Sequence, residues 1–287
     1  MKRLPFVFSA WLGAAIALFA AEPSDFRLER NVAYLPEGRA EKADLYLPLE
    51  IAKGTRVPAV VIIHGGGFTG GKRDAARELN IGGTLARNGY LGMSIDYALA
   101  GPNTPMWPQN LHDCKTAVRW LRANAERLQI DPAHIGVIGG SAGGTLASLV
   151  TLTRAGDGLD PAAPYGELSC AVQCGVDLYG IADMVSWHDN AMFGKTNAEA
   201  PEMYRQASPV TYARADGSPI LILHGTADKT VDVAQSEGFA AVLKKAGAPH
   251  ELIIIPDAPH TFDLQPKQRD LRPVVLGFFD RNLKPAR

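Results

Sequence analysis

The sequence predicts an α/β fold with a mostly parallel central sheet flanked by helices. Three observations support this fold class. Short apolar runs alternate along the chain with segments in which apolar residues recur at helical spacing. Several runs, such as Val57–His64, are continuously apolar, which is typical of strands covered on both faces of a parallel sheet. The 287 residues, 46% of them hydrophobic, are sufficient for one large domain with a sizeable core.

The first expected elements are strands. Two antiparallel strands come first, joined by a turn around Glu37 and Gly38. Two buried strands follow, and the earlier of them ends in three glycines. In chain order the four strands are Asn31–Leu35, Ala43–Leu47, Val57–His64 and Leu91–Ile95.

The second half of the chain continues the alternation of strand and helix. Apolar residues at helical spacing predict an amphipathic helix from about Gln109 to Leu128. Asp131 and Pro132 then turn the chain into the next strand, which a helix rich in small residues follows. The expected strands are Ile135–Gly139, Ala171–Tyr179, Ile220–Leu223 and Leu252–Ile255, and the expected helices are Ala142–Thr153, about Val233 to Ala246, and Leu271–Asn282.

One segment, residues 181–210, fits this alternation poorly. It has little periodicity and contains Trp187 and His188. Loops after the carboxyl ends of strands carry the binding site in open α/β sheets. The segment is therefore interpreted as an insertion or small cap over the site, or else as an irregular helix that packs on the domain.

The amino terminus is typical of a secretory signal peptide. Lys2 and Arg3 precede an apolar run from Phe6 to Phe19, and the small residues Ala20 and Ala21 follow it. The run is shorter than the roughly 20 apolar residues that span a bilayer. We expect residues 1–21 to be removed and residues 22–287 to form a single exported domain, periplasmic or extracellular, without stable membrane insertion. An uncleaved anchor is the alternative.

Charge and cysteine content exclude several classes of function. The formal charge is −1, with no basic stripe that would favour nucleic acid. Cys170 and Cys174 lie four residues apart in an expected strand, roughly 13 Å and too far for a disulfide. Cys114 falls on the apolar face of an expected helix. All three cysteines are interpreted as small buried apolar residues, and no Cys/His cluster has the spacing of a zinc site.

The strongest motif is Gly139-Gly140-Ser141-Ala142-Gly143-Gly144, a G-x-S-x-G between an expected strand and an expected helix. A serine is a poor nucleophile until a base removes its proton, and a sharp strand-to-helix turn lifts its hydroxyl into a cleft. Such a turn tolerates only small neighbours, which accounts for the glycines. Ser141 is therefore the expected nucleophile of a serine hydrolase. A glycine-rich turn with an idle serine is the alternative.

A second glycine run, His64-Gly65-Gly66-Gly67-Phe68, follows an earlier core strand. Acyl transfer builds negative charge on the carbonyl oxygen, and fixed backbone N–H groups stabilise it. Gly66 and Gly67 are the expected donors, with the N–H of Ala142 as a further one. His64 lies before these donors, so we expect it to shape the loop rather than to act as a base.

The general base must follow the serine, because the order along the chain is Ser, Asp or Glu, His. His260 lies in a loop just after the strand Leu252–Ile255, at the edge of the sheet where the serine also lies. His250 precedes the same strand and falls at the opposite edge. His224 ends a strand only four residues before the best acid, and His188 could touch substrate.

Asp228 is the expected orienting acid, because it comes directly after the strand Ile220–Leu223. Its carboxylate would accept the proton on His260 Nδ1 and stabilise the imidazolium. Asp96 precedes the serine and Asp177 lies inside a strand, so both are expected to be structural. The other competitors are Asp232 and Asp257, the latter very close to His260 in sequence.

Together these motifs resemble the α/β-hydrolase superfamily. The H-G-G-G-F loop with G-G-S-A-G-G is similar to the branch of hormone-sensitive-lipase-type esterases and bacterial acetyl-xylan and feruloyl esterases, with closer likeness to the compact carbohydrate esterases. The resemblance runs from about Leu45 to the carboxyl terminus. It implies a triad of Ser141, Asp228 and His260 and an oxyanion hole in the glycine loop. The chain departs from relatives at Pro259, where they often have glycine.

The leading functional hypothesis is an exported esterase that removes acetyl, or secondly feruloyl, groups from plant polysaccharide such as xylan. No metal or organic cofactor is expected. Trp107, Trp187 and His188 are candidate substrate contacts, although aromatic residues at such positions also serve as packing. The alternatives are a general short-chain carboxylesterase or lipase-like enzyme, a peptidase, and a catalytically silent binding protein on the same fold.

Overall fold

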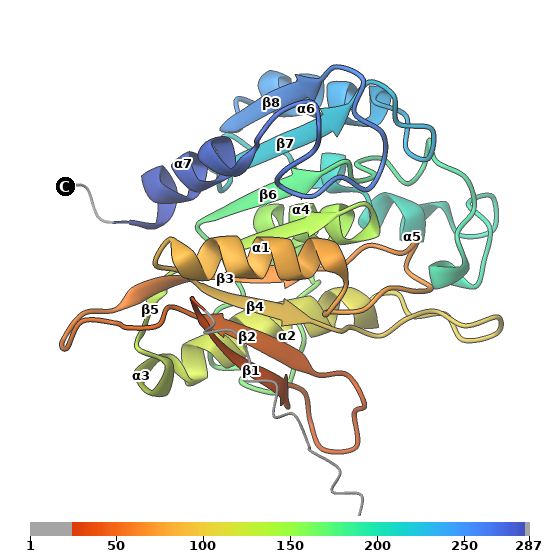
Figure 1. Ribbon diagram of the computed structural model, residues 1–287. Helices are drawn as coiled ribbons and strands as arrows, with labels where there is room; N and C mark the ends of the chain where they lie inside the picture. The colour runs from red at the N-terminus through yellow and green to blue at the C-terminus, as the bar shows by residue number, and fades with distance from the viewer. Residues whose placement is uncertain (1–24, 285–287) are drawn as a thin grey trace, which may run out of the picture.

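An eight-stranded sheet runs through the centre of the computed structural model, which describes residues 25–284 (Figure 1). The expected signal peptide over residues 1–21 lies outside the described residues. The strand order is β1-β2-β4-β3-β5-β6-β7-β8; β2 is antiparallel to both neighbours, and every pair from β4 to β8 in this order is parallel. The strands are β1 (Arg27–Val32), β2 (Ala43–Leu47), β3 (Val57–Ile63), β4 (Leu91–Ile95), β5 (Ile130–Gly140), β6 (Cys174–Leu178), β7 (Ile220–Gly225) and β8 (His250–Ile255).

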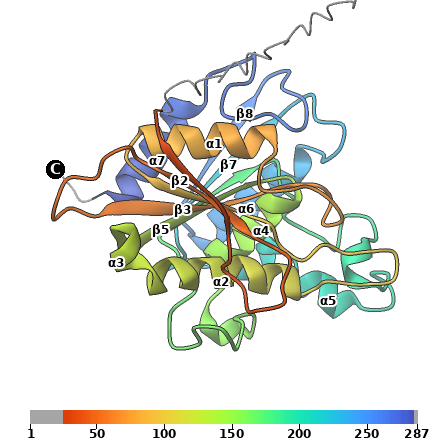
Figure 2. The ribbon, with the colours of Figure 1, turned by 60° about the horizontal axis from the view of Figure 1, so that its bottom comes forward.

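Helices cover both faces of the sheet, which confirms the predicted fold class (Figure 2). Alternate residues of β3 point to opposite sides: Val61 joins a core formed with α2, α3, α4 and α6, whereas Ile62 joins a core formed with α1 and α7. The continuous apolar runs follow from this double coverage. The helices are α1 (Ala76–Arg87), α2 (Gln109–Ala123), α3 (Ala125–Leu128), α4 (Ala142–Leu152), α5 (Pro201–Gln206), α6 (Ala234–Ala246) and α7 (Arg272–Leu283).

The register of the parallel strands brings their carboxyl ends to one edge of the sheet. Ile63 of β3 lies opposite Gly139 of β5, and Gly140 lies opposite Leu178 of β6. β7 and β8 end at the same level. The glycine run, Ser141 and the loops after β7 and β8 all leave the sheet at this edge, so residues far apart in sequence become neighbours there.

Several element boundaries differ from the sequence-based expectation. The first strand is Arg27–Val32 rather than Asn31–Leu35, because Asn31 takes a positive φ of 59° and the ladder shifts there. The long helix after β4 divides into α2 and α3 at Asn124, whose side chain donates to the Trp120 carbonyl at 2.9 Å. Helix α1 between β3 and β4 was not expected at all.

Residues 181–210 form short turns and the helix α5 beside the loop that follows β4. Met106 and Trp107 donate backbone hydrogen bonds to the Met192 carbonyl, at 2.9 and 3.0 Å. A cavity of about 540 Å³ lies between these two segments and is lined by residues 101–105 and by residues of the stretch 189–199. Whether the segment closes over a substrate stays a prediction.

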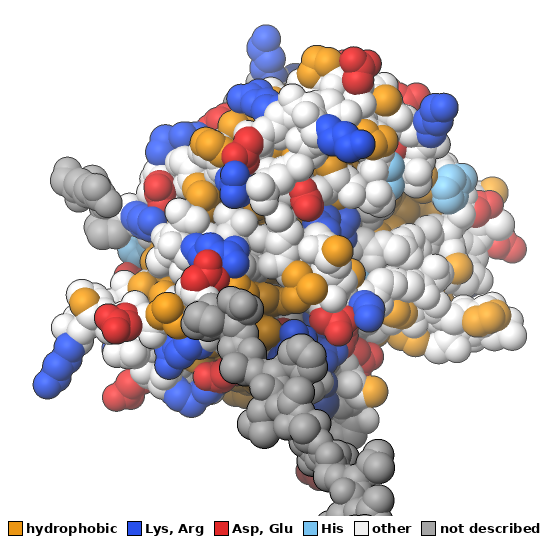
Figure 3. Space-filling view, viewed as in Figure 1, with side chains coloured by type: hydrophobic (Ala, Val, Ile, Leu, Met, Phe, Trp, Pro, Cys, Tyr) orange, Lys and Arg blue, Asp and Glu red, His pale blue; other side chains and the backbone are white. Residues whose placement is uncertain are grey.

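The distribution of surface charge and the burial of the cysteines agree with the expectations from the sequence. Basic and acidic side chains are interspersed on the face seen in Figure 3, without a stripe of one sign. Cys114, Cys170 and Cys174 are free and buried, which confirms their interpretation as small core residues. Within residues 25–284, no helix is long and apolar enough to cross a bilayer.

Candidate active site

The turn between β5 and α4 places Ser141 in a strained backbone conformation, with φ 57° and ψ −125°. Its N–H donates to the Leu178 carbonyl at 2.9 Å, which fixes the turn against the neighbouring strand. Glycine is required at Gly143, because an added Cβ would lie 2.2 Å from the backbone oxygen of Ile63. This close packing of α4 on β3 holds the serine at the carboxyl edge of the sheet.

A continuous chain of hydrogen bonds joins Ser141, His260 and Asp228. The Ser141 hydroxyl lies 3.0 Å from His260 Nε2, and His260 Nδ1 lies 2.6 Å from Asp228 Oδ2. The other carboxylate oxygen accepts the N–H groups of Thr230 and Val231, at 2.8 and 2.9 Å. Although burial opposes the charge, the bonds from His260 and these two N–H groups hold the pKa of Asp228 below its usual value.

The tautomer of His260 follows from this geometry. An ionised carboxylate only accepts hydrogen bonds, so Nδ1 carries the proton that points to Asp228. Nε2 is then free to accept the proton of the Ser141 hydroxyl. The Tyr179 ring lies edge-on to the imidazole, with 4.8 Å between the ring centroids, and its hydroxyl donates to the Phe262 carbonyl at 2.5 Å. Asp228 and Tyr179 therefore restrict how far the imidazole can move.

The glycine run after β3 curls beside the serine. Gly66 and Gly67 take φ values of 119° and 62°, which residues with a side chain adopt only at a cost. A Cβ on Gly65 would lie 3.2 Å from Ser141 Cβ, so the run directly contacts the nucleophilic turn. The N–H groups of Gly66, Gly67 and Ala142 have no acceptor among the described residues. Three backbone donors are thus free near the serine hydroxyl.

His64 shapes this loop, as the sequence suggested. Its side chain is buried and stacks on Tyr97, with 4.3 Å between the ring centroids. His64 Nδ1 lies 2.7 Å from the Gly65 carbonyl oxygen. Burial lowers the pKa of His64, which favours the neutral imidazole in the folded protein.

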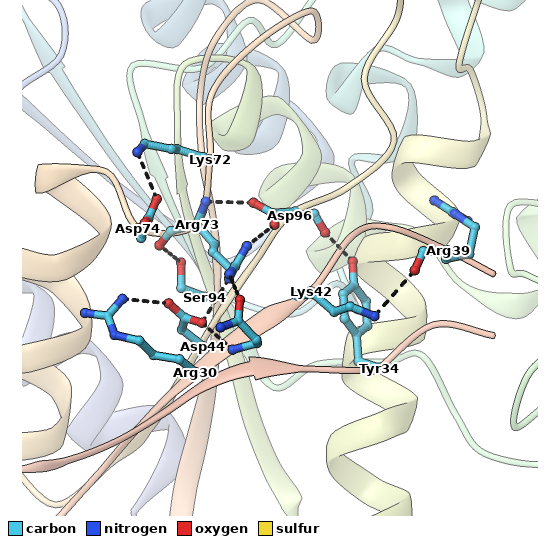
Figure 4. A network of polar contacts seen from close by, with 11 residues as sticks. Arg30, Tyr34, Arg39, Lys42, Asp44, Lys72, Arg73, Asp74, Ser94 and Asp96 are labelled. Carbon is cyan, nitrogen blue, oxygen red and sulfur yellow. Dashed lines mark hydrogen bonds and ion pairs between the residues drawn. The ribbon is translucent and has the colours of Figure 1, made fainter. Parts of the chain in front are cut away.

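A polar network fixes the chain where it leaves the glycine loop (Figure 4). The Arg73 side chain bonds Asp44 Oδ1 at 2.9 Å and also reaches the carboxylate of Asp96 and the side chain of Asn31. The Arg73 N–H donates to Asp96 Oδ1 at 2.9 Å, and its carbonyl accepts from Ser94 at 2.8 Å. Asp96 is therefore a structural residue, and the loop is tied to the antiparallel edge of the sheet.

The competing acids and bases have other partners. Asp177 Oδ1 accepts from the Gly180 N–H, and its Oδ2 accepts from the Ser148 hydroxyl. His224 is fully buried; its Nδ1 lies 2.7 Å from Ser236 Oγ, and its Nε2 lies 2.9 Å from the Val231 carbonyl oxygen and 3.2 Å from Asp228 Oδ2. A carbonyl oxygen only accepts, so Nε2 carries the proton that points to Val231, and His224 fixes the loop whose N–H groups bond Asp228, which the sequence order alone did not indicate.

A cavity of about 410 Å³ opens beside Ser141. It is lined by the glycine loop, the start of α1 and the loops after β5, β7 and β8, namely Gly65, Gly66, Gly67, Ala75, Arg77, Glu78, Ser141, Thr230, His260 and Thr261. Trp107, Trp187 and His188 are not among these residues. Trp107 packs edge-on against Phe193, and the Trp187 ring lies tilted against the His188 ring. A role for them in substrate binding stays a prediction.

Sequence reasoning missed Arg77, Glu78 and Tyr179. Arg77 donates to Glu78 and to the Tyr179 hydroxyl, and a Cβ on Gly140 would lie 2.6 Å from Arg77 Nη1. The guanidinium therefore lies against the backbone just before Ser141. A charged pair shortly after a glycine loop is a possible signal, but helix α1, which carries the pair, was not expected from the sequence.

Comparison with known proteins agrees with this fold. Esterase LipQ of Mycobacterium tuberculosis is 31% identical over 258 residues, which cover 86% of this chain and 58% of LipQ. Ethyl acetate hydrolase of Pseudomonas putida is 29% identical over 79% of this chain and 72% of its own length. This chain spans little more than half the length of several curated relatives, LipQ among them.

Solved structures show the same architecture. A truncated carbohydrate esterase from gut microbiota superposes with a TM-score of 0.83 at 26% identity, over 92% of this chain and 99% of that one. Thermogutta terrifontis esterase 2 with bound propionate has a TM-score of 0.75 at 24% identity, over 92% and 97% of the two chains, and this likeness concerns the fold alone. The fold is that of the α/β-hydrolase esterases.

The family model BD-FAE matches residues 43–243, which include the glycine loop, the turn at Ser141 and the acid Asp228. This match covers more than half of the chain, so the protein belongs to the BD-FAE family.

Proposed function

We propose that this protein hydrolyses carboxylic esters, with Ser141 as nucleophile, His260 as general base and Asp228 as the group that orients the base. The observation that carries the proposal is the chain of hydrogen bonds from Ser141 through His260 to Asp228, at 3.0 and 2.6 Å, beside three unused backbone donors. Relatives that are esterases or carboxylic ester hydrolases support the same reaction.

The reaction follows from these positions. His260 Nε2 takes the proton of Ser141 as its Oγ attacks the ester carbonyl, and the N–H groups of Gly66, Gly67 and Ala142 stabilise the negative oxygen. The imidazolium then gives its proton to the departing alcohol, which leaves an acyl group on Ser141. Water, activated by His260, attacks this acyl-enzyme and releases the acid and the free serine. Asp228 stabilises the imidazolium in both halves of the reaction.

We propose short acyl groups, acetyl first, and carbohydrate as the alcohol. Apart from Ser141 and His260, the cavity is lined by glycine, alanine, threonine and charged side chains, with no large aliphatic or aromatic residue among them. Without long aliphatic side chains in its walls, the cavity has no deep apolar channel that would favour a long acyl chain. The carbohydrate esterase among the structural neighbours supports a sugar ester. The ethyl acetate hydrolase relative favours the second candidate, a general short-chain carboxylesterase.

Rates on a small panel of esters test the proposal. We expect purified protein to cleave 4-nitrophenyl acetate faster than the butyrate and octanoate, and to release acetate from acetylated xylan; methyl ferulate probes the feruloyl alternative. Ser141→Ala should lose roughly 10⁴-fold or more in kcat, with residual activity from the oxyanion donors alone. Full activity in Ser141→Ala would exclude the assigned nucleophile. Rapid octanoate turnover without acetate release from xylan would favour the lipase-like alternative.

Export is a separate proposal that rests on the sequence. Lys2, Arg3 and the apolar run Phe6–Phe19 support removal of residues 1–21 during secretion. The intact mass of the secreted protein tests it. A mature chain that begins near Glu22 supports cleavage, whereas a full-length chain retained in the membrane fraction supports an anchor.

A further inference from the structure

A charge-paired arginine lines the cavity beside Ser141. Arg77 and Glu78 follow the glycine loop at the start of α1, and both line the cavity of about 410 Å³. The Arg77 side chain is 14% exposed and that of Glu78 only 1%. The guanidinium therefore reaches the cavity, and the carboxylate lies behind it.

The hydrogen bonds of this pair leave several groups unused. Arg77 Nε and Nη2 both donate to Glu78 Oε1, at 2.9 and 2.6 Å, and Nη1 donates to the Tyr179 hydroxyl at 3.0 Å. A guanidinium has five N–H groups, so two of them have no acceptor among the described residues. Glu78 Oε2 also has no partner there. Unused donors and an unused acceptor thus lie side by side.

The guanidinium is close to the reacting serine. A Cβ built on Gly140, the residue before Ser141, would lie 2.6 Å from Arg77 Nη1. A Cβ on Gly65 would lie 3.3 Å from Arg77 Nη2. Arg77 therefore contacts the backbone of both the nucleophilic turn and the glycine loop, and a substrate attacked by Ser141 comes within its reach.

The charges of Arg77 and Glu78 together favour an uncharged ligand group. Burial disfavours the charge on Arg77, but Tyr179 and Glu78 outweigh it and hold the pKa of Arg77 above its usual value. Burial raises the pKa of Glu78, and Arg77 opposes this. When both are ionised the pair has no net charge, so a carboxylate ligand attracted by Arg77 is also repelled by Glu78. A hydroxyl group avoids this repulsion, because it is uncharged and both donates and accepts.

We propose that Arg77 and Glu78 form a subsite that binds a hydroxyl group of the substrate, which directs hydrolysis to esters of polyhydroxylated alcohols. A spare N–H of Arg77 donates to the hydroxyl oxygen, and Glu78 keeps the site neutral. The inference rests on the proposed ester hydrolysis at Ser141 and names the alcohol side of its substrates.

Two acetates that differ by one hydroxyl test the subsite. Cyclohexyl acetate and 2-hydroxycyclohexyl acetate present the same leaving ring, without and with a neighbouring hydroxyl. We expect the wild-type protein to have a kcat/KM roughly tenfold higher on the hydroxylated ester, as a hydrogen bond to a charged group provides. In Arg77→Met, which keeps the length of the aliphatic stem and removes all N–H donors, this ratio should fall to about one.

A second variant tests the charge argument. Glu78→Gln keeps the shape of the pair but leaves the guanidinium with an uncompensated charge. The ratio to measure is kcat/KM on 2-acetoxycyclohexane carboxylate divided by kcat/KM on cyclohexyl acetate. We expect this ratio to be roughly tenfold higher in Glu78→Gln than in the wild-type protein. Each ratio is formed within one protein preparation, so partial misfolding cancels, and this variant remains informative if Arg77→Met does not fold.

The outcomes separate the two proposals. A wild-type protein that cleaves neither cyclohexyl acetate nor 4-nitrophenyl acetate would contradict ester hydrolysis, and the subsite with it. If these esters are cleaved but the wild-type preference for the hydroxylated ester is absent, only the subsite is overturned. The same holds if that preference persists in Arg77→Met, or if Glu78→Gln leaves the anionic ester disfavoured as before.

Discussion

Two carboxylates near the strand ends have opposite pKa shifts, and this difference separates their roles. Asp228 accepts hydrogen bonds from His260 and from two backbone N–H groups, which keep its pKa below the usual value. Asp177 is fully buried between β6 and α4, and burial raises its pKa to about 6. The first carboxylate is therefore ionised at neutral pH, whereas ionisation of the second costs stability.

The role of Asp228 can be measured by removing only its charge. In Asp228→Asn the amide cannot hold His260 in the tautomer that accepts the Ser141 proton, so we expect kcat to fall roughly 10⁴-fold while the fold persists. Steady-state rates on 4-nitrophenyl acetate provide the measurement. Asp232→Asn is the matched control, because within residues 25–284 the Asp232 side chain accepts only from the Ala234 N–H. Equal rates in the two variants would contradict the assignment.

The pH dependence of stability depends in part on Asp177. Between pH values of about 4 and 6 the folded state holds a proton that the unfolded state releases, so this group makes the free energy of unfolding fall as pH rises. The full loss is on the order of 3 kcal/mol and is complete above pH 7. Asp177→Asn should remove it. Urea denaturation of both proteins at pH 4 and pH 7 measures this; a difference between the proteins that does not change with pH would contradict it.

At the scale of elements, the packing of α4 on β3 holds the nucleophile. Gly143→Ala would place a Cβ 2.2 Å from the Ile63 carbonyl oxygen and 2.5 Å from that of His64. Backbone atoms of a central strand cannot move aside cheaply, so the helix and Ser141 would shift. We expect a loss of about 1–3 kcal/mol in unfolding free energy and a fall in kcat/KM, measured by denaturation and ester hydrolysis.

A glycine in another helix gives the control. Gly238 lies inside α6, and an added Cβ would meet nothing within 4 Å. Gly238→Ala should stabilise the protein by about 0.5–1 kcal/mol and leave its rates unchanged. If Gly143→Ala behaved like Gly238→Ala, close packing at the turn would not be what positions the serine.

The elements that sequence predicted well are those with a strong local pattern. β4 has the predicted bounds, and α4 differs by one residue, because apolar continuity and small residues mark them. Helix α1 was missed because it begins in a polar stretch and presents Gly82 and Gly83 to its neighbours. Glycines are poor helix formers, so the pattern was weak; packing of Gly82 on the Tyr46 ring, which lies far away in sequence, stabilises the helix.

The site shows the same division between local and distant information. Ser141, Asp228 and His260 could be proposed from the sequence, because each lies in the turn or loop that follows a strand and their order is diagnostic. The contacts of Arg77 with Tyr179 and of His224 with Asp228 depend on side-chain directions, which spacing does not encode. The sequence thus indicated the hydrogen-bonded chain but not the groups that surround it.

For the whole molecule, the three free cysteines predict indifference to redox conditions. All are buried, and burial raises the pKa of each thiol. We expect dithiothreitol to leave the midpoint of thermal unfolding unchanged, and iodoacetamide to label the thiols only in denaturant, as mass spectrometry detects. A drop in the midpoint under reduction would show that a disulfide contributes.

The convergence of the strand ends at one edge of the sheet has a consequence for synthesis and folding. The glycine loop follows β3 and Ser141 follows β5, whereas His260 follows β8, the last strand within residues 25–284. A growing chain therefore has its nucleophile in place long before its base, and hydrolysis can begin only once the carboxyl-terminal strand has docked. Long-range pairings of this kind form slowly. The time at which ester cleavage appears during refolding would thus report when the entire domain has folded. A chain stalled before β8 would not hydrolyse esters.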